Sequence, residues 1–288
     1  MAAIEQQDPS RPGERLRTAL LEALAEIASA LEASSPGPRQ VHLARRAAKR
    51  ARSLARLAPD RLEMLARATR HATTHARRGF GAARDADVRT STIRSLHNRL
   101  SDDTQALLVA VASASSPDAF GADRAAASAE IAALLRDWRL CDAQADVDQV
   151  VDAAARAYRR GRRRMKRART GGTQELHDWR TAVVDYEYQA EFLGVDILDM
   201  RRRAEGADRL RRLLGDITDL DALGAWLHES PAAGSDARIA MQKARYAMAE
   251  RRARLVEKAF ALGATVYAER TGVWREGLRR GFARAGNA

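Results

Sequence analysis

The sequence predicts an all-α fold, and three observations support that prediction. Apolar residues make up 45% of the chain and are mainly Ala and Leu, while aromatic residues make up only 5%. Together with abundant Arg and Glu, this composition favours helices that pack closely through small side chains. No segment shows the apolar–polar alternation of a half-buried strand. A length of 288 residues allows one large domain or two smaller ones.

Proline and glycine divide the first half into five predicted helices. The polar residues 1–13 are typical of a flexible tail. Breakers follow at SSPGP (34–38), at Pro59-Asp60 and at the glycine-containing stretch GFGAARDADV (79–88). We expect helices over about 14–32 and 41–58, a third to about 78, a fourth after the glycine turn, and a fifth from about 102. The polar stretch SASSPDAFG (113–121) is the predicted seam between the two halves.

The second half also contains only helical patterns. TGGT at 170–173 and SPAAGSD at 230–236 are its main breakers, and TQEL (173–176) carries a capping signal. We expect helices over about 123–138, 143–169 and 173–193, two shorter helices over 200–214 and 217–228, and a long helical region over 236–283.

A short internal repeat predicts a duplicated architecture. VHLARRA (41–47) is echoed by LHDWRTA (176–182), and an acidic signature follows each His at similar spacing, RDADV (84–88) and GDITDL (215–220). Such duplications usually pack as two bundles. We therefore predict two four-helix-type bundles with long helices, related by a pseudo-two-fold axis, with repeats over about 14–116 and 117–285.

The net charge of +12 and the isoelectric point of about 10.7 indicate an anionic partner. The positive charge is almost all Arg, whose planar donor fork suits phosphate oxygens. Cys141 is the single cysteine, which excludes disulfides and cysteine-rich zinc sites. No apolar run approaches the roughly 20 residues of a membrane span, and the first residues lack the apolar core of a signal peptide. We expect a cytoplasmic protein.

The stretch VHLARRAAKRARSL (41–54) forms a helix with one basic face. At 100° per residue, its basic side chains lie within about 80° of His42, and Ala and Leu occupy the opposite arc. The members of this stripe are Arg45, Arg46, Lys49, Arg52 and, just beyond, Arg56. No acidic residue interrupts it, although like charges at these spacings repel. Taken alone, the stripe is either a solvated face or a ligand surface.

A second basic run, RAYRRGRRRMKRART (156–170), favours the ligand surface. One face carries Arg159, Arg162, Arg163, Lys166 and Arg169. Readers of nucleic-acid bases usually interleave aromatic platforms with such charges, whereas Trp138, Trp179, Trp226 and Trp274 lie where core packing is expected. A phosphate chain needs only the cationic donors. Binding of nucleic acid by the same stripes is the alternative.

These motifs resemble the CHAD domain (conserved histidine α-helical domain) in their order and spacing. The matching segments are VHLARRAAKRARSL, ARDADV, AYRRGRRRMKRA, LHDWRTAVVDYEYQAEFLG, RLLGDITDLDAL and ALGATVYAER…GLRRGF. The resemblance covers roughly 14–285 and implies a duplicated helical fold, one domain, that binds inorganic polyphosphate through basic surfaces lined by histidines. It implies no catalysis, cofactor or metal, and a location at polyphosphate granules. The implied site comprises the five bases of the first stripe with His42, Arg84, Arg159, Arg162, Arg163, Lys166, His177 and Arg180.

The second motif departs from the family pattern. Val184, Asp185 and Glu187 stand where basic residues are expected. Either the ligand surface is asymmetric, with the helix over 156–169 compensating, or His177 is structural; we favour the asymmetric surface. His71 and His75 have the spacing of two metal ligands, but no Cys or carboxylate cluster accompanies them, so we expect no metal site.

Overall fold

The computed structural model describes residues 12–33, 36–80, 82–113, 123–195, 197–229 and 234–286, and these ranges form helices and connecting turns without a strand. The all-α prediction is therefore confirmed. The helices are α1 (Pro12–Glu32), α2 (Pro38–Leu54), α3 (Glu63–Gly79), α4 (Ala82–Arg94), α5 (Asp102–Ser113), α6 (Asp123–Leu140), α7 (Val147–Ala168), α8 (Thr173–Leu193), α9 (Leu198–Glu229), α10 (Ser235–Val266) and α11 (Thr271–Ala285), with the 3-10 turns η1 (Ala55–Leu57) and η2 (Asp60–Leu62) between α2 and α3. α1 begins at Pro12, inside the predicted tail, and residues 1–11 lie outside the described ranges.

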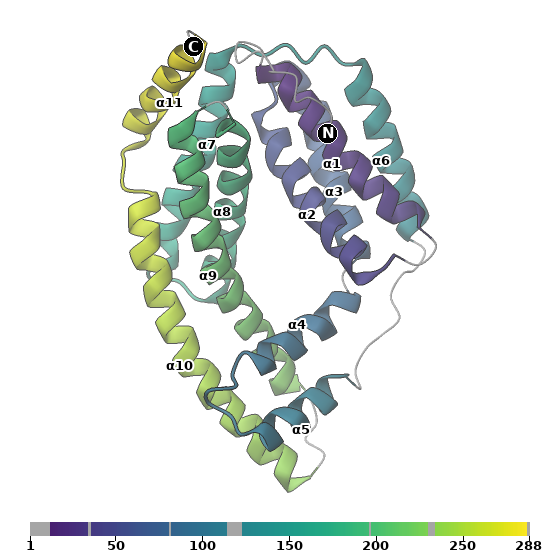
Figure 1. Ribbon diagram of the computed structural model, residues 1–288, viewed down its shortest axis with the longest axis vertical. Helices are drawn as coiled ribbons and strands as arrows, with labels where there is room; N and C mark the ends of the chain where they lie inside the picture. The colour runs from purple at the N-terminus through teal and green to yellow at the C-terminus, as the bar shows by residue number, and fades with distance from the viewer. Residues whose placement is uncertain are drawn as a thin grey trace.

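Two four-helix groups stand out, joined by a central layer (Figure 1). The first group is closed by α1, α2, α3 and α6, each of which packs against two others. The second, distal group consists of α4 and α5 together with the adjacent ends of α9 and α10. Helix α8 contacts both α2 and α9, α7 packs against α8, and α11 covers α7 at the end of the molecule away from the distal group (Figure 1).

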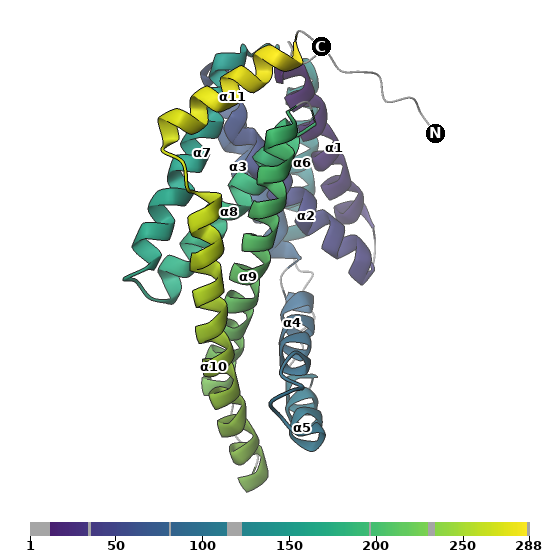
Figure 2. The same ribbon diagram turned by 60° about the vertical axis from the view of Figure 1, so that its left-hand side comes forward.

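The two helix groups do not coincide with the two halves of the sequence repeat. α6 follows the predicted seam but packs against α1 and α3, whereas the α4–α5 pair crosses to α9 and α10 (Figure 2). The distal group has its own apolar cluster, in which Ile93 and Leu96 meet Leu220, Leu223 and Met241. The α4–α5 pair therefore buries its apolar face against helices from the other half of the chain.

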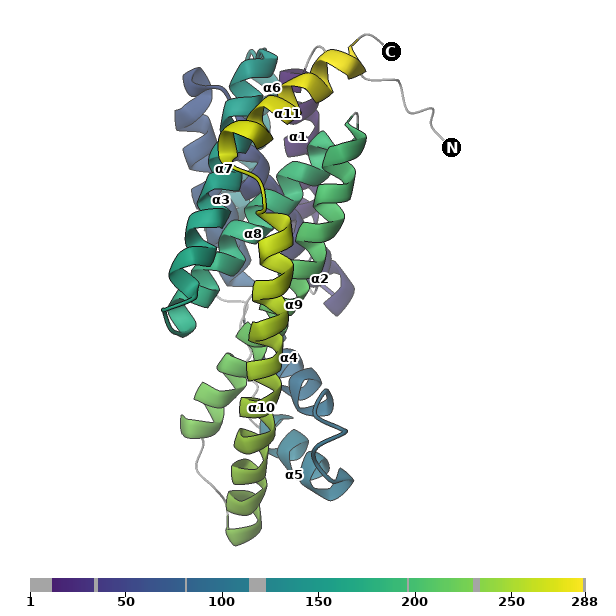
Figure 3. The same cartoon turned by 90° about the vertical axis from the view of Figure 1, so that its left-hand side faces the viewer.

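α9 and the C-terminal region differ from the predicted helix boundaries. The segments over 200–214 and 217–228 form one helix, which continues through the buried Gly215. The region over 236–283 is instead divided by residues 267–270, where Tyr267 turns into the core. At this break the chain changes direction, and α11 packs across α7 (Figure 3).

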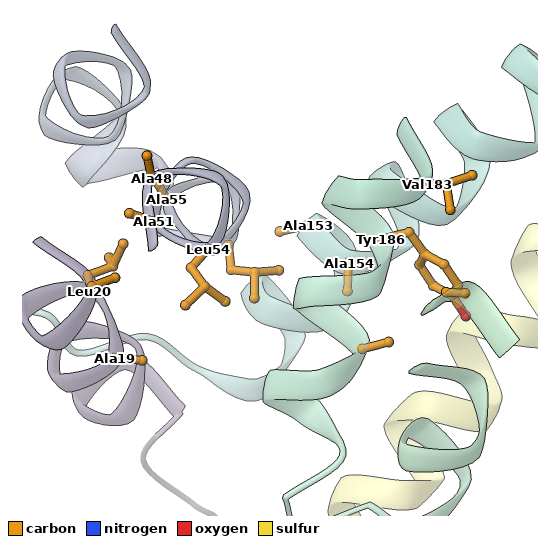
Figure 4. Packing of buried hydrophobic residues seen from close by; sticks show 14 of the residues in the cluster. Ala19, Leu20, Ala48, Ala51, Leu54, Ala55, Ala153, Ala154, Val183 and Tyr186 are labelled. Carbon is orange, nitrogen blue, oxygen red and sulfur yellow. The ribbon is translucent and has the colours of Figure 1, made fainter. Parts of the chain in front are cut away.

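Small side chains set the close packing of the main core. Leu54 of α2 points between Ala19 and Leu20 of α1 on one side and Ala153 and Ala154 of α7 on the other (Figure 4). Leu54 and Leu20 are fully buried, which stabilises the fold by about 1.5–3 kcal/mol per side chain. Because alanine lines the facing helices, their backbones can approach closely.

Aromatic residues fill the centre of the second half. Tyr158 of α7 stacks on Trp274 of α11 with ring centroids 4.9 Å apart. Tyr186 packs against both of these rings, and Tyr267 packs against Tyr158 and Tyr186. Trp274, Trp138 and Trp179 are buried, as predicted; Trp226 is half-buried beneath Arg89. Across the described ranges, no helix combines the length and apolar character that crossing a bilayer requires.

Candidate polyanion-binding surfaces

Two neighbouring arginines of α2 have different environments. Arg46 is exposed, whereas Arg45 is buried and its Nη1 donates to the carbonyl oxygens of Arg77 (3.2 Å) and Phe80 (2.8 Å). These carbonyls end α3, where unpaired acceptors and the helix dipole favour a cation. Arg45 therefore ties α2 to α3 and does not belong to the exposed part of the stripe.

The C-terminal part of the α2 stripe meets a buried carboxylate of α8. Asp185 has a side chain only 2% exposed. Its Oδ1 lies 3.5 Å from Arg52 Nη2 and 3.0 Å from the Ser53 hydroxyl, and its Oδ2 lies 3.1 Å from Arg56 Nε. Arg160 of α7 completes the group, with Nη2 3.0 Å from Oδ2. We call this group the Asp185 hub.

In the hub one carboxylate is shared by three arginines. Burial lowers the pKa of the Arg56 guanidinium and the Asp185 carboxylate opposes that shift, while Arg160, Arg70 and Arg52 add to it. A buried carboxylate is tolerated because cations and a hydroxyl surround it. The stripe has no acid within its own sequence, but the fold supplies one at this end.

The N-terminal part of the stripe borders a cleft between α2, α8 and α9. Arg46 is the stripe residue that lines this cleft. His42, one helical turn before Arg46, is exposed, and Lys49, about one turn after it, is half-buried. The cleft has a volume of about 580 Å³. Three basic and four acidic residues are among its lining: Arg46, Arg201 and Arg212 with Glu187, Glu191, Glu205 and Asp208. Its charge is therefore mixed, as the acidic departure in the second motif foreshadows.

Glu187 is the buried acid of this cleft. Arg211 Nε lies 2.9 Å from its Oε1 and 2.7 Å from its Oε2, and Asp208 also pairs with Arg211. Burial raises the pKa of Glu187 to about 7, although the nearby Arg211 opposes the shift. Arg211 and Arg212 on this side of α9 therefore form ion pairs with the neighbouring acids Glu187 and Asp208.

The basic stripe on α7 faces solvent, with Arg159, Arg163 and Lys166 exposed and Arg162 half-buried. Asp146 caps the helix by accepting the Gln149 amide at 2.7 Å, and the apolar face packs toward α8 and α11. Within the described ranges, no carboxylate pairs with the outward members of the stripe, which are Arg159, Arg162, Arg163 and Lys166. We call these four residues the α7 stripe. Arg169, on the same predicted face, lies over the Phe260 ring.

The same helix turns two other arginines inward. Arg160 reaches the Asp185 hub, and Arg164 Nη1 lies 2.7 Å from Asp178 Oδ2 of α8. One side of α7 is therefore neutralised by α8, and the adjacent side faces solvent. α7 reaches the hub through Arg160 and not through any residue of the α7 stripe.

The remaining predicted residues lie on α8 and α4. His177 is exposed near the start of α8, and Arg180 packs against the backbone of Gly215 in α9. The side chain of Arg84, in α4, lies outside the described part of the structure.

Asp185 and Arg160 are the site-forming residues that sequence reasoning missed. A signal was present, because Asp185, Glu187 and Gln189 interrupt the apolar pattern of α8, and every residue from Ala182 to Ala190 is buried. Polar residues in a fully buried helix need partners. Their partners could not be identified from spacing, since they come from α2, α7 and α9.

The two histidines with metal-ligand spacing, His71 and His75, have different surroundings. His71 is exposed, while His75 Nδ1 lies 3.3 Å from Glu130 Oε2 of α6. Over the residues that the structure describes, no three metal-ligating side chains gather into a group.

Comparison with known proteins supports one family. The model of the CHAD domain matches residues 18–228. The crystal structure of the CHAD domain from the plant Ricinus communis resembles this fold with a TM-score of 0.60 and 21% sequence identity, over 94% of this chain and 96% of that one. At this identity the likeness concerns the fold alone. No curated protein matches the sequence significantly.

Proposed function

The chain belongs to the CHAD domain family, and we propose on that basis that it binds inorganic polyphosphate without catalysing a reaction. The observation that carries the proposal is the α7 stripe, in which Arg159, Arg163 and Lys166 are exposed and Arg162 is half-buried, all without an acidic partner in the described ranges. Such a face suits a linear anion because each guanidinium or ammonium group can bind phosphate oxygens. Unpaired like charges on one helix also repel, and a bound polyanion removes that repulsion.

The proposed surface is asymmetric and has two kinds of member. The α7 stripe, Arg46, Lys49, His42, His177, Arg180 and Arg84 are the proposed direct ligands. Arg45, Arg52 and Arg56 are predicted site residues whose side chains are engaged by protein groups. We propose that these three contribute positive potential and hold α2 in place.

A binding titration at several salt concentrations tests this function. Polyphosphate of tens of units should bind far more tightly than orthophosphate, because a longer chain engages more cations at once. Its affinity should fall steeply with salt as counterions are released. Equal affinity for the polymer and for orthophosphate at moderate ionic strength would exclude the proposal.

Nucleic acid is the competing ligand, since the same stripes could bind its phosphates. We expect polyphosphate to displace DNA or RNA much better than the reverse at fixed salt, because no aromatic residue interleaves with the α7 stripe. Release of phosphate from polyphosphate in the presence of Mg²⁺ would instead reveal an enzyme. We further propose a cytoplasmic location, with association to polyphosphate granules.

A further inference from the structure

A basic face of α10 lies beside the turn that joins α4 to α5. The turn is bonded to α10 by the Arg99–Glu250 ion pair and by Arg251, which donates to the carbonyl of Ser95. α10 begins after residue 228, where the family match ends. This face is therefore distinct from the motifs and stripes considered so far.

A surface cavity of about 390 Å³ opens between the turn and the helix. Among its described lining residues are four bases and no acid: Arg99, Arg251, Arg254 and Lys258. The three on α10 follow the i, i+3, i+7 spacing of one helix face. We call these four residues the distal cationic site.

The site is held in place but retains free donors. Arg99 and Arg251 are fixed by their bonds to Glu250 and Ser95, yet a guanidinium has five N–H donors. The Arg254 side chain is 54% exposed and lies 3.7 Å from Glu250. Lys258 is exposed and has no ion-pair partner among the described residues. These remaining donors suit an anion with several phosphate groups.

An exposed aromatic ring stands at one end of the site. Tyr246 is 78% exposed, whereas the other tyrosines, at 158, 186, 188 and 267, are buried. It lines an adjacent cavity of about 540 Å³ together with Lys243, and this cavity shares Arg99 with the first. Both volumes lie within the roughly 300–1,000 Å³ of small-molecule sites. An accessible ring beside cations is a platform on which a planar base can stack.

We propose that the distal cationic site and Tyr246 bind a nucleoside di- or triphosphate. Tyr246 and Arg254 are eight residues apart, about 12 Å along the helix. A base stacked on Tyr246 would direct its phosphate chain past Arg99, which lines both cavities, toward Arg254. Glu250 also lines the Tyr246 cavity, and its carboxylate is paired with Arg99 and Arg254. A nucleic-acid strand would instead call for several stacking rings in succession, and this face offers one.

Calorimetric titrations of the full chain with ATP, inorganic tripolyphosphate and adenosine test the proposal. ATP should bind more tightly than tripolyphosphate, and adenosine should bind far more weakly than either. The Arg254→Gln/Lys258→Gln variant should lose at least about tenfold in affinity for both phosphate compounds. Tyr246→Ser should weaken ATP about fivefold or more while leaving tripolyphosphate unchanged. Arg238→Gln, an exposed residue near the start of the same helix, is the control and should change neither.

The proposal is overturned if ATP binds no better than tripolyphosphate, or if Tyr246→Ser leaves the ATP affinity unchanged. All the substituted side chains are exposed, so the variants should melt at the wild-type temperature. Polyphosphate binding is tested separately, by titrating long polyphosphate into the wild type and into variants of the α7 stripe. Loss of long-chain binding in those variants, with ATP binding intact, distinguishes the two sites.

Discussion

The hydroxyl of Ser53 in α2 donates a 3.0 Å hydrogen bond to Oδ1 of Asp185 in α8. The next turn of α8 repeats the link, since the Gln189 amide donates to the carbonyl oxygen of Ser53 at 2.8 Å. One residue of α2 is thus bonded to two successive turns of α8. These bonds fix the first four-helix group against the central layer.

Replacing Asp185 by Asn should destabilise the fold by about 3 kcal/mol, because it removes the negative charge shared by Arg52, Arg56 and Arg160. Urea unfolding gives the value. Asp178→Asn is the matched control: its ion pair with Arg164 is about one-third exposed, so its loss should cost less than about 1 kcal/mol. Equal losses for the two variants would contradict the role assigned to the hub.

Arg45→Ala should mainly reduce stability and Arg46→Ala should mainly reduce polyphosphate binding, although the residues are adjacent. Arg45→Ala should lower the free energy of unfolding by about 2 kcal/mol, because it removes charge-assisted hydrogen bonds to the end of α3. Arg46→Ala should change stability by less than about 0.5 kcal/mol but weaken polyphosphate binding. Thermal unfolding and a binding titration on both variants check this, and a reversed pattern would remove Arg46 from the proposed surface.

Arg159→Gln/Arg163→Gln should weaken polyphosphate binding and reduce the slope of log affinity against log salt by about 1 to 1.5, as expected for two lost phosphate contacts. The control is Arg136→Gln/Arg139→Gln on α6, which removes the same charge from another exposed face. If both double variants weaken binding equally, net charge and not the α7 stripe governs affinity.

Gly161→Ala should destabilise the protein by about 1–3 kcal/mol through overpacking, because the new methyl group would overlap the buried ring of Tyr267. Gly277→Ala in α11 meets no atom within 4 Å and should gain about 0.5–1 kcal/mol from helix propensity. The difference in melting temperature between these two Gly→Ala variants measures the packing effect directly. A stabilising Gly161→Ala would show that α7 can move away from Tyr267.

Glu187 should make stability depend on pH. Its pKa in the fold is about 7, above its ordinary value of 4.5, so between these values the native state holds a proton that the unfolded state lacks. The free energy of unfolding should therefore fall as pH rises from about 4.5 to 7, by up to about 1.4 kcal/mol per pH unit. Glu187→Gln should remove this contribution, as urea unfolding at pH 5, 6 and 7 can measure; an unchanged slope would contradict it.

The helices could be predicted largely from breakers and periodicity, because these signals are local. The two short helices expected over 200–214 and 217–228 are one helix, in which Gly215 packs beside Arg180. The break at 267–270 could not be predicted, because it accompanies the burial of Tyr267 against the rings of Tyr158 in α7 and Tyr186 in α8. Such contacts join residues far apart in the sequence.

The helical wheel placed Arg45 and Arg46 on one face but could not separate them. Their difference depends on where α3 ends, which the sequence of α2 does not contain. For the same reason, the acid that balances Arg52 and Arg56 could not be assigned from the stripe. The distal cationic site has no counterpart in the sequence repeat, because it needs the α4–α5 turn to lie against α10.

The crossed membership of the distal group has a consequence for synthesis on the ribosome. Chains emerge from the N-terminus, and domains fold as their parts become available. Ile93 and Leu96 emerge long before Leu220, Leu223 and Met241, which cover them in the finished fold. The α4–α5 segment must therefore wait with its apolar face open to water while the first group, closed by α6, is already able to assemble. The distal group can close only after α10 has emerged, and until then its apolar face is accessible to chaperones and prone to aggregation.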